Sequence, residues 1–395
     1  MNGDFFIRAG HLVDGSGRPA ARDALICVEA GRIADILPGA SAFAPPPPGA
    51  APVLDFSCAT IIPGLVDAHA HLCWSGTSDP AIRKAQLSPD EGRAFRMIRD
   101  HVRDHLAAGV SAVRDGGDRL GRALAFASAY GGPLEIRAAG RAWHAPGRYG
   151  GLIGRPVPPG LTLASAIASD PEPGHHVKVV QSGLNSLTEF GKRTRPQFSL
   201  EELTLAVDAA RSRGLSVMAH ANGEEAVKIA AAAGCASIEH GFFMGRENLK
   251  RLAGSGCLWI PTAATMQGYA DSLAPESPEA ATARRMLDHQ IEQIALARSY
   301  GATLATGTDA GSPGVFHGRA VHRELALFLR AGFTPEEAVR AATANGARLL
   351  GLPRSGLLAP GSDATFLALS GPPAALPESL ATPIAFYIKG KRVDA

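Results

Sequence analysis

The sequence predicts an α/β fold, namely a (β/α)8 TIM-like barrel with a small β-sandwich domain built from both ends of the chain. Eight short apolar, β-branched runs alternate with amphipathic helical stretches between residues 59 and 350, which is the pattern of successive βα units. Strand-like segments without intervening helices flank this region on both sides. No GxGxxG motif follows the first run, so a dinucleotide-binding sheet is disfavoured.

The two chain ends predict the small domain. Residues 1–58 contain the strand-like stretches FFIRAGHLVD and ALICVEAGRIADILPG, with Gly31 where a tight hairpin needs a glycine. Residues 351–395 contain DATFLALS and PIAFYIKGKRVD, separated by a Gly/Pro-rich turn. We expect these two ends to pair into one β-sandwich domain. Residues 59–350 then form the barrel, which would carry the active site.

The middle of the chain supplies eight strand candidates, in the order TIIPGLVDAHAHL, VSAVRDGGD, LEIRAAGRAWH, HHVKVVQSG, LSVMAHANG, ASIEHGFF, CLWIPTAA and ATLATGTDAG. Helical stretches separate them. In the stretch after the fourth run, Ser199 is a good N-cap, and Glu202 three residues later completes a capping box. Gly214 stands just past the end of this predicted helix.

Composition argues against several classes of function. The chain has 395 residues, of which 46% are hydrophobic and 19% charged, with a formal net charge of +2. Because acidic and basic residues are spread along the chain, we expect neither nucleic acid nor a membrane as a partner. No apolar run reaches the roughly 18 residues that cross a bilayer, and the first residues lack a signal-peptide pattern. Five cysteines without CxxC spacing suit free thiols in the cytoplasm.

Unusual polar residues stand at the carboxyl ends of the predicted strands, where barrel proteins carry their sites. His69 and His71 end the first run, and their i, i+2 spacing directs both imidazoles to the same face. The later runs contribute Lys178, His220, His240 and Asp309. Imidazole and carboxylate groups are the ligands that suit zinc and its neighbours, so the pattern predicts a metal site.

Each of these residues also has a structural interpretation. A single histidine in a strand is commonly a hydrogen-bonded core or surface residue, and Asp309 also suits a turn or a helix N-cap. Lys178 is harder to explain, because an ammonium between Val177 and Val179 is costly to bury unless a carboxylate of a neighbouring strand pairs with it. The metal site is favoured because these residues occur in order at successive strands.

The motifs IIPGLVDAHAHL, VKVVQSG, VMAHANGEEAVKIAAAAGCASIEHGFF and TGTDAGSP resemble the metal signature of the amidohydrolase superfamily, and within it the imidazolonepropionase-like and Xaa-Pro dipeptidase-like branch. The resemblance spans nearly the whole chain. It implies that His69, His71 and Asp309 hold one divalent metal ion. It also implies that His220 and His240 hold a second one.

The resemblance further implies that Lys178 is carboxylated on Nζ and bridges the two ions, for which zinc is the expected element. Carboxylation needs an uncharged amine, which burial favours by lowering the pKa of lysine. Two such cations lower the pKa of a shared water and provide a metal-bridging hydroxide at neutral pH. Asp309 is then the expected catalytic residue, which takes the proton of the hydroxide and delivers it to the leaving nitrogen. The implied function is hydrolysis of an amide, peptide, N-acyl or carbamate-like C–N bond.

Loops after the strands are expected to select the substrate, which we expect to be a small molecule. The candidate substrate-binding residues are His144, Arg148 and Tyr149, after the third run, and Asn222, after the fifth. A solvated Gly/Pro loop explains the first three equally well. Dipeptidase-like relatives often have Gly-Gly-His where this chain has Gly147, Arg148 and Tyr149, and a tyrosine in place of Asn222. These departures argue against a strict dipeptidase.

The alternative function is that of a mononuclear deaminase, or of a cyclic-amide hydrolase that acts on a nitrogen heterocycle as imidazolonepropionase does. Such enzymes often carry a glutamate soon after the fifth-strand histidine, for which Glu224 and Glu225 are candidates, and they generally do not need a lysine such as Lys178. We also expect Arg114 and Asp115 to form an ion pair beneath the site. Homo-oligomers are common in the resembling families, although no segment of this sequence marks an interface.

Overall fold

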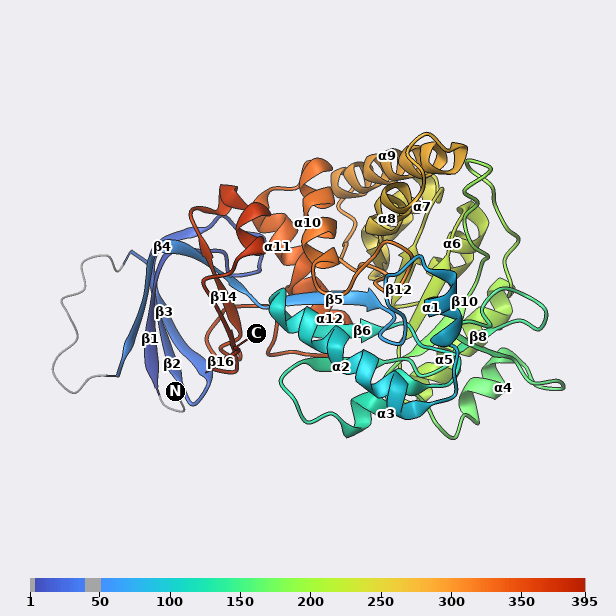
Figure 1. The fold of residues 1–395 in the computed structure, drawn as a ribbon, viewed down its shortest axis with the longest axis horizontal. Helices are drawn as coiled ribbons and strands as arrows, with labels where there is room; N and C mark the ends of the chain where they lie inside the picture. Colours follow the sequence, from blue (N-terminus) through green and yellow to red (C-terminus); the bar gives the residue numbers. More distant parts are fainter. Residues whose placement is uncertain (1–3, 40–50, 395) are drawn as a thin grey trace.

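The two ends of the chain meet in one sheet in the computed structural model, which describes residues 4–39 and 51–394. The strand order is β16-β15-β14-β4-β1-β2-β3. The strands are β1 (Phe5–Leu12), β2 (Ala21–Glu29), β3 (Arg32–Leu37), β4 (Val53–Pro63), β14 (Phe366–Ser370), β15 (Ala385–Ile388) and β16 (Lys391–Arg392). β4 pairs parallel with β1 and antiparallel with β14, where Ile62 lies opposite Leu367. Figure 1 shows this sheet beside the larger, helix-covered part of the molecule, and β4 stays paired within the sheet as far as Pro63.

The hairpin between β2 and β3 turns at Ala30 and Gly31, whose φ angles are 49° and 77°. A two-residue turn with both φ angles positive matches the twist of the flanking strands, and glycine adopts this conformation without strain. The hairpin expected at Gly31 is therefore confirmed.

The middle of the chain forms two parallel sheets, of order β13-β12-β11-β10-β8-β9 and β5-β6-β7. The strands are β5 (Leu65–Ala70), β6 (Val110–Asp115), β7 (Glu135–Ala138), β8 (Ala142–His144), β9 (Gly154–Pro156), β10 (Val177–Val180), β11 (Val217–Ala221), β12 (Ser237–His240) and β13 (Leu258–Ile260). The register aligns Val180 with His220 and Ala221 with His240. The carboxyl ends of these neighbouring strands therefore lie at one edge of the larger sheet.

Two of the eight predicted runs differ from a simple strand. The third divides into β7 and β8, which belong to different sheets. The eighth, residues 302–311, forms isolated bridges to β13 and to β5. There the Asp309 amide donates to the His69 carbonyl at 2.7 Å, and the φ of Asp309 is 56°. Because a positive φ breaks the extended geometry, Asp309 lies in an irregular segment rather than at the end of a regular strand.

Helices pack around the parallel sheets (Figure 1). They are α1 (Pro80–Ala85), α2 (Glu91–Ala107), α3 (Arg122–Ala129), α4 (Leu163–Ala168), α5 (Leu200–Ser212), α6 (Glu224–Ala232), α7 (Arg246–Ser255), α8 (Ala264–Ser272), α9 (Pro278–Ser299), α10 (Ala320–Arg330), α11 (Pro335–Ala342) and α12 (Ala344–Leu349), with short 3-10 turns at Pro373–Ala375 and Glu378–Ala381. The predicted capping box of α5 is confirmed, since the side chains of Ser199 and Glu202 each accept a bond from the other's amide. In the described ranges, no helix is both long enough and apolar enough to cross a membrane.

Candidate metal centre

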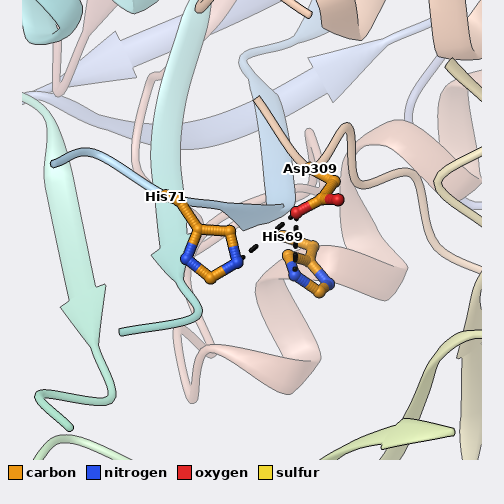
Figure 2. Close-up of side chains that lie close together, drawn as sticks. All are labelled: His69, His71 and Asp309. Carbon is orange, nitrogen blue, oxygen red and sulfur yellow. Dashed lines mark ion pairs between the residues drawn. The ribbon is translucent and has the colours of Figure 1, made fainter. Parts of the chain in front are cut away.

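His69, His71 and Asp309 direct polar atoms toward one point, as Figure 2 shows. The Oδ1 atom of Asp309 lies 3.5 Å from His69 Nε2 and 3.4 Å from His71 Nε2. His69 lies on β5, His71 follows directly after it, and Asp309 comes from the irregular segment bridged to the same strand. Two imidazole nitrogens and a carboxylate oxygen at these separations can share one divalent metal ion.

Two further histidines extend this cluster. The centroid of the His240 ring lies 4.9 Å from that of His69 and 4.6 Å from that of His220. His220 lies on β11 and His240 ends β12, and all these side chains are buried. The structure thus brings together the four histidines that the sequence singled out.

Lys178 lies among these histidines. Its side chain, on β10, is buried, and its Nζ atom is 3.5 Å from His69 Nε2. Burial lowers the pKa of Lys178 to about 8, against the opposing charges of Glu239 and Asp309. Within the described chain, no carboxylate lies close enough to form an ion pair with this amine. The structural interpretation of Lys178, a salt bridge to a neighbouring strand, therefore finds no partner among these residues.

One nitrogen of each imidazole is held by the protein. The bonds are His69 Nδ1 to Glu239 Oε2 at 2.7 Å, His71 Nδ1 to the Gly117 carbonyl at 2.8 Å, His240 Nδ1 to Thr262 Oγ1 at 2.7 Å, and His220 Nε2 to the Gly183 carbonyl at 3.2 Å. Such partners fix the ring orientation and the tautomer, and they leave the lone pair of the other nitrogen available to a metal.

Burial also sets the protonation states of the cluster. It lowers the pKa of His71 to about 4 and of His220 to about 3, and it holds the pKa values of His69 and His240 well below their usual range. Neutral imidazole is the form that binds a metal. Burial raises the pKa of Asp309 to about 6, so this carboxyl group can exchange a proton near neutral pH. Four neutral imidazoles, a carboxylate and the buried amine of Lys178 form a donor set that fits divalent metal ions.

Two of these residues have a left-handed backbone. The φ angles of His240 and Asp309 are 68° and 56°. Such a conformation costs a non-glycine residue of order 1 kcal/mol or more and is concentrated at functional sites. At His240 it interrupts the alternation of a regular strand, so that Glu239 and His240, although adjacent in sequence, both reach His69.

A cavity of about 420 Å³ opens onto the cluster. Tyr149 and Asn222 line it, and the Tyr149 ring lies 5.5 Å from the His220 ring between centroids. The other two predicted substrate contacts lie outside the lining of this cavity. The Nδ1 atom of His144 donates to the carbonyl of Ala145, and Arg148 donates to a carbonyl of the neighbouring loop at 2.6 Å.

Glu224 and Glu225 lie on α6, away from this cavity. Glu224 pairs with Arg193 at 3.0 Å and Glu225 with Lys228 at 3.6 Å, and both carboxylates are more than half exposed. The two glutamates line a separate surface depression instead. The structure therefore does not bring either candidate glutamate of the mononuclear alternative to the cluster.

The expected ion pair between Arg114 and Asp115 does not form. Arg114 pairs with Glu239 at 3.4 Å, whereas Asp115 accepts bonds from the Leu72 and Gly117 amides at 2.7 and 2.8 Å. The reason is geometric, since successive residues of a strand point to opposite faces. The predicted pair is wrong because the prediction overlooks Glu239, whose signal in the sequence is a carboxylate directly before His240 in the strand run ASIEHGFF.

Comparison with known proteins places these residues in a family. The amidohydrolase family model matches residues 60–394. An uncharacterized protein of Mycobacterium tuberculosis is 30% identical over 301 residues, which cover 74% of this chain and 75% of that protein. The imidazolonepropionase of Deinococcus deserti is 29% identical over 354 residues, with 82% and 80% covered.

A solved structure of a Xaa-Pro dipeptidase with methionine bound in its active site has a TM-score of 0.81 with this chain at 25% identity. The superposition covers 99% of this chain and 100% of that one. With the parallel sheets described above, this likeness indicates a TIM-like barrel with an added small domain. The chain therefore belongs to the amidohydrolase family, whose members are hydrolases of C–N bonds that commonly bind divalent metal ions.

Proposed function

We propose that this amidohydrolase cleaves an amide, peptide, N-acyl or carbamate-like bond of a small molecule at a centre of two metal ions. The observation that carries the proposal is Lys178, a buried amine without a carboxylate partner in the described chain, 3.5 Å from a histidine nitrogen of the cluster. A pKa lowered to about 8 leaves about a tenth of this lysine neutral at pH 7, far more than an exposed lysine would have. A neutral amine is the form that carbon dioxide can carboxylate.

His69, His71 and Asp309 would hold one ion, and His220 and His240 the other. Carboxylated Lys178 would bridge them, and zinc is the ion that suits this donor set best. The distances within the first group and the ring contacts between the two groups support this division. Divalent ions, when bound, supply Lewis acidity that activates water and polarises a carbonyl group.

Asp309 would carry the proton. Its Oδ2 atom accepts a 2.9 Å bond from Ser312, which orients the carboxylate, while Oδ1 faces both histidine nitrogens. This carboxyl group would take a proton from the nucleophile and return it to the leaving nitrogen. Tyr149 and Asn222 would contact the substrate from the cavity wall, and His144 and Arg148 would do so only after a movement of their loop.

The architecture that would carry this site is a closed (β/α)8 barrel over residues 59–350. The bridges of residues 302–311 to β13 and β5 support closure on that side. Residues 1–58 and 351–395 would form the two halves of a β-sandwich domain, apart from the segments outside the described residues. The strand order β16-β15-β14-β4-β1-β2-β3, which joins strands of both chain ends in one sheet, supports their assembly into one domain, although β4 stays in this sheet as far as Pro63.

The first test is the metal content of the protein, purified without chelator in bicarbonate-containing buffer and measured by elemental mass spectrometry. About two equivalents per chain are expected from the binuclear proposal. About one equivalent would favour the mononuclear deaminase or cyclic-amide hydrolase. The 29% identity to an imidazolonepropionase supports this alternative. Release of ammonia from nitrogen heterocycles would then be the activity to measure.

The second test concerns the bridge. Lys178→Ala should lose one equivalent of metal and most activity, and a short carboxylic acid such as propionate should restore part of both. Lys228→Ala is the matched control, because Lys228 is an exposed lysine paired with Glu225 on α6. Full activity and full metal content in Lys178→Ala would contradict the bridging role.

A further inference from the structure

One wall of the cavity carries a cation that the metal cluster does not use. Arg83 lies in the last turn of α1 and lines the cavity. Its side chain is only half-buried, and its Cζ atom lies 5.3 Å from the centroid of the Trp74 ring. The guanidinium group is therefore held against an aromatic face while its remaining donors stay accessible.

Arg83 is anchored through one nitrogen. Nη1 donates to the carbonyls of Gly311 at 3.0 Å, Thr77 at 3.3 Å and Ser75 at 3.4 Å. These carbonyls carry no net charge, and within residues 4–39 and 51–394 no carboxylate forms an ion pair with this guanidinium. A guanidinium group has five N–H donors, so the donors of Nε and Nη2 remain for a ligand. A fixed fork of this kind matches the two oxygens of a carboxylate.

Tyr269 of α8 lines the same cavity. Burial raises the pKa of its phenol, the charge of Asp309 adds to this effect, and Arg83 opposes it. The hydroxyl group is therefore protonated at neutral pH and can donate a hydrogen bond to an anion. Arg83 and Tyr269 together give the cavity a charged donor and a neutral donor.

Other parts of the lining are apolar and come from different elements. They are Leu152, Ile153, Leu184, Leu187, Phe242 and Met266. Leu152 and Leu184, in the loops near β9 and after β10, are 48% and 57% exposed. Exposed leucines that line one cavity mark a place where an apolar group of a ligand can be covered.

We propose that Arg83 is a specificity-determining residue that binds a carboxylate of the substrate, so that the enzyme prefers amides with a free carboxylate beside the scissile bond and an apolar substituent. N-acyl derivatives of apolar amino acids are the simplest members of this class. The inference rests on the proposed hydrolase function and adds the substrate class. The carboxylate contacts Arg83, the apolar substituent covers the exposed leucines, and the scissile amide lies at the cluster.

The kinetic test uses two substrates that differ in one group, N-hexanoyl-phenylalanine and N-hexanoyl-2-phenylethylamine, which lacks the carboxylate. The metal-loaded wild-type enzyme should prefer the acid in kcat/KM. Arg83→Met should lower kcat/KM for the acid by roughly 10- to 100-fold, as expected for a charge-assisted bond, and leave the neutral amide unchanged. Lys84→Met, which removes the neighbouring exposed cation of α1, should change neither value.

A binding test separates this inference from the hydrolase function. Calorimetry would measure the binding, to the same metal-loaded proteins, of the ketone in which a methylene group replaces the amide nitrogen of N-hexanoyl-phenylalanine. Weaker binding to Arg83→Met than to wild type and Lys84→Met supports the inference, even if no amide is hydrolysed. Equal binding to all three proteins, or no binding to wild type, overturns it, even if neutral amides are hydrolysed. A parallel loss on both substrates would identify Arg83 as a structural residue and would likewise overturn the inference.

Discussion

Glu239 on β12 accepts a 2.7 Å hydrogen bond from the Nδ1 atom of His69 on β5, although the two strands belong to different sheets. The other carboxylate oxygen of Glu239 lies 3.4 Å from the buried Arg114 guanidinium on β6. One carboxylate thus orients a candidate metal ligand and balances the charge of an arginine. This bond ties the two parallel sheets together beneath the cluster.

Glu239→Gln should weaken metal binding, because the amide cannot serve both His69 and Arg114 as the carboxylate does. Loss of the acceptor behind a metal-binding imidazole typically lowers metal affinity or activity by about 10- to 100-fold. Metal content after dialysis against graded chelator concentrations measures the effect. Glu247→Gln changes an exposed carboxylate on α7 and should behave as wild type. An unchanged chelator profile in Glu239→Gln would show that His69 does not depend on this bond.

Gly116→Ala should disturb the metal site by steric contact alone. A Cβ atom at this position would lie 2.7 Å from His71 Cε1 and 3.3 Å from His69 Nε2. The imidazoles would have to shift away from their present positions, and overpacking of this kind costs about 1–3 kcal/mol. We expect lower metal content and lower kcat. Gly131→Ala is the control, because a Cβ atom there meets nothing within 4 Å. Wild-type metal content in Gly116→Ala would mean that the rings have room to move.

Asp309→Asn should retain metal but lose activity, since an amide oxygen can still bind an ion whereas an amide cannot accept the proton. Loss of a general acid–base group typically lowers kcat by about 10²- to 10⁴-fold. Elemental analysis and steady-state kinetics on the same preparation separate the two effects. Asp271→Asn, on the exposed side of α8, is the control. A variant that keeps wild-type kcat would exclude the proton-transfer role of Asp309.

Three histidines packed behind the site should make the fold sensitive to acid. His105 on α2 lies 3.3 Å from His317, whose ring stacks on that of His101 at 3.9 Å between centroids. Burial lowers the pKa of His105 to about 3 from an unfolded value near 6.5. Between these two values the unfolded chain binds a proton that the folded chain does not. The free energy of unfolding therefore falls as pH falls below 6.5, by up to about 1.4 kcal/mol per pH unit for this residue.

His105→Phe should remove this contribution, so that the free energy of unfolding falls less steeply as pH is lowered below 6.5. Urea unfolding at pH 7, 6 and 5 measures the slope for both proteins. The comparison uses the slope rather than the absolute stability, because the variant also deprives His317 of a neighbour. Identical slopes would show that His105 does not titrate differently in the folded and unfolded chains.

The sequence predicted the parts of the site that regular geometry places. His69 and His71 share a face because strand side chains repeat every second residue, and His220 and His240 meet because parallel strands end at one edge. Lys178 stood out because a lone ammonium in an apolar run requires an explanation. The β-rich ends could be recognised as partners from their similar patterns, and β14 does pair with β4, although through residues 59–63.

The other features of the site depend on irregular backbone geometry, which the sequence does not predict. In a regular strand, the side chains of Glu239 and His240 would point to opposite faces. The positive φ of His240 changes this, and the residue types do not predict it. The residue pattern predicts a strand that ends at Asp309, whereas this segment forms isolated bridges. Arg83 lies on a short helix in a loop, and only the tertiary structure brings that loop to the cavity. Arg148 is expected from the sequence to contact the substrate, but its guanidinium group donates to a backbone carbonyl of a neighbouring loop instead.

The pairing of β4 with β14 also has a consequence for folding during translation. Residues 59–63 emerge early, yet their antiparallel partners at 366–370 are translated some 300 residues later. Until then one edge of β4 stays unpaired, and such edges favour intermolecular association. Most parallel strands between them pair with a neighbour in sequence, so their partners are translated before β14 is. During synthesis β4 can pair with β1, but its other edge must wait for β14, and the nascent polypeptide stays open to aggregation along that edge until residues 366–370 are translated.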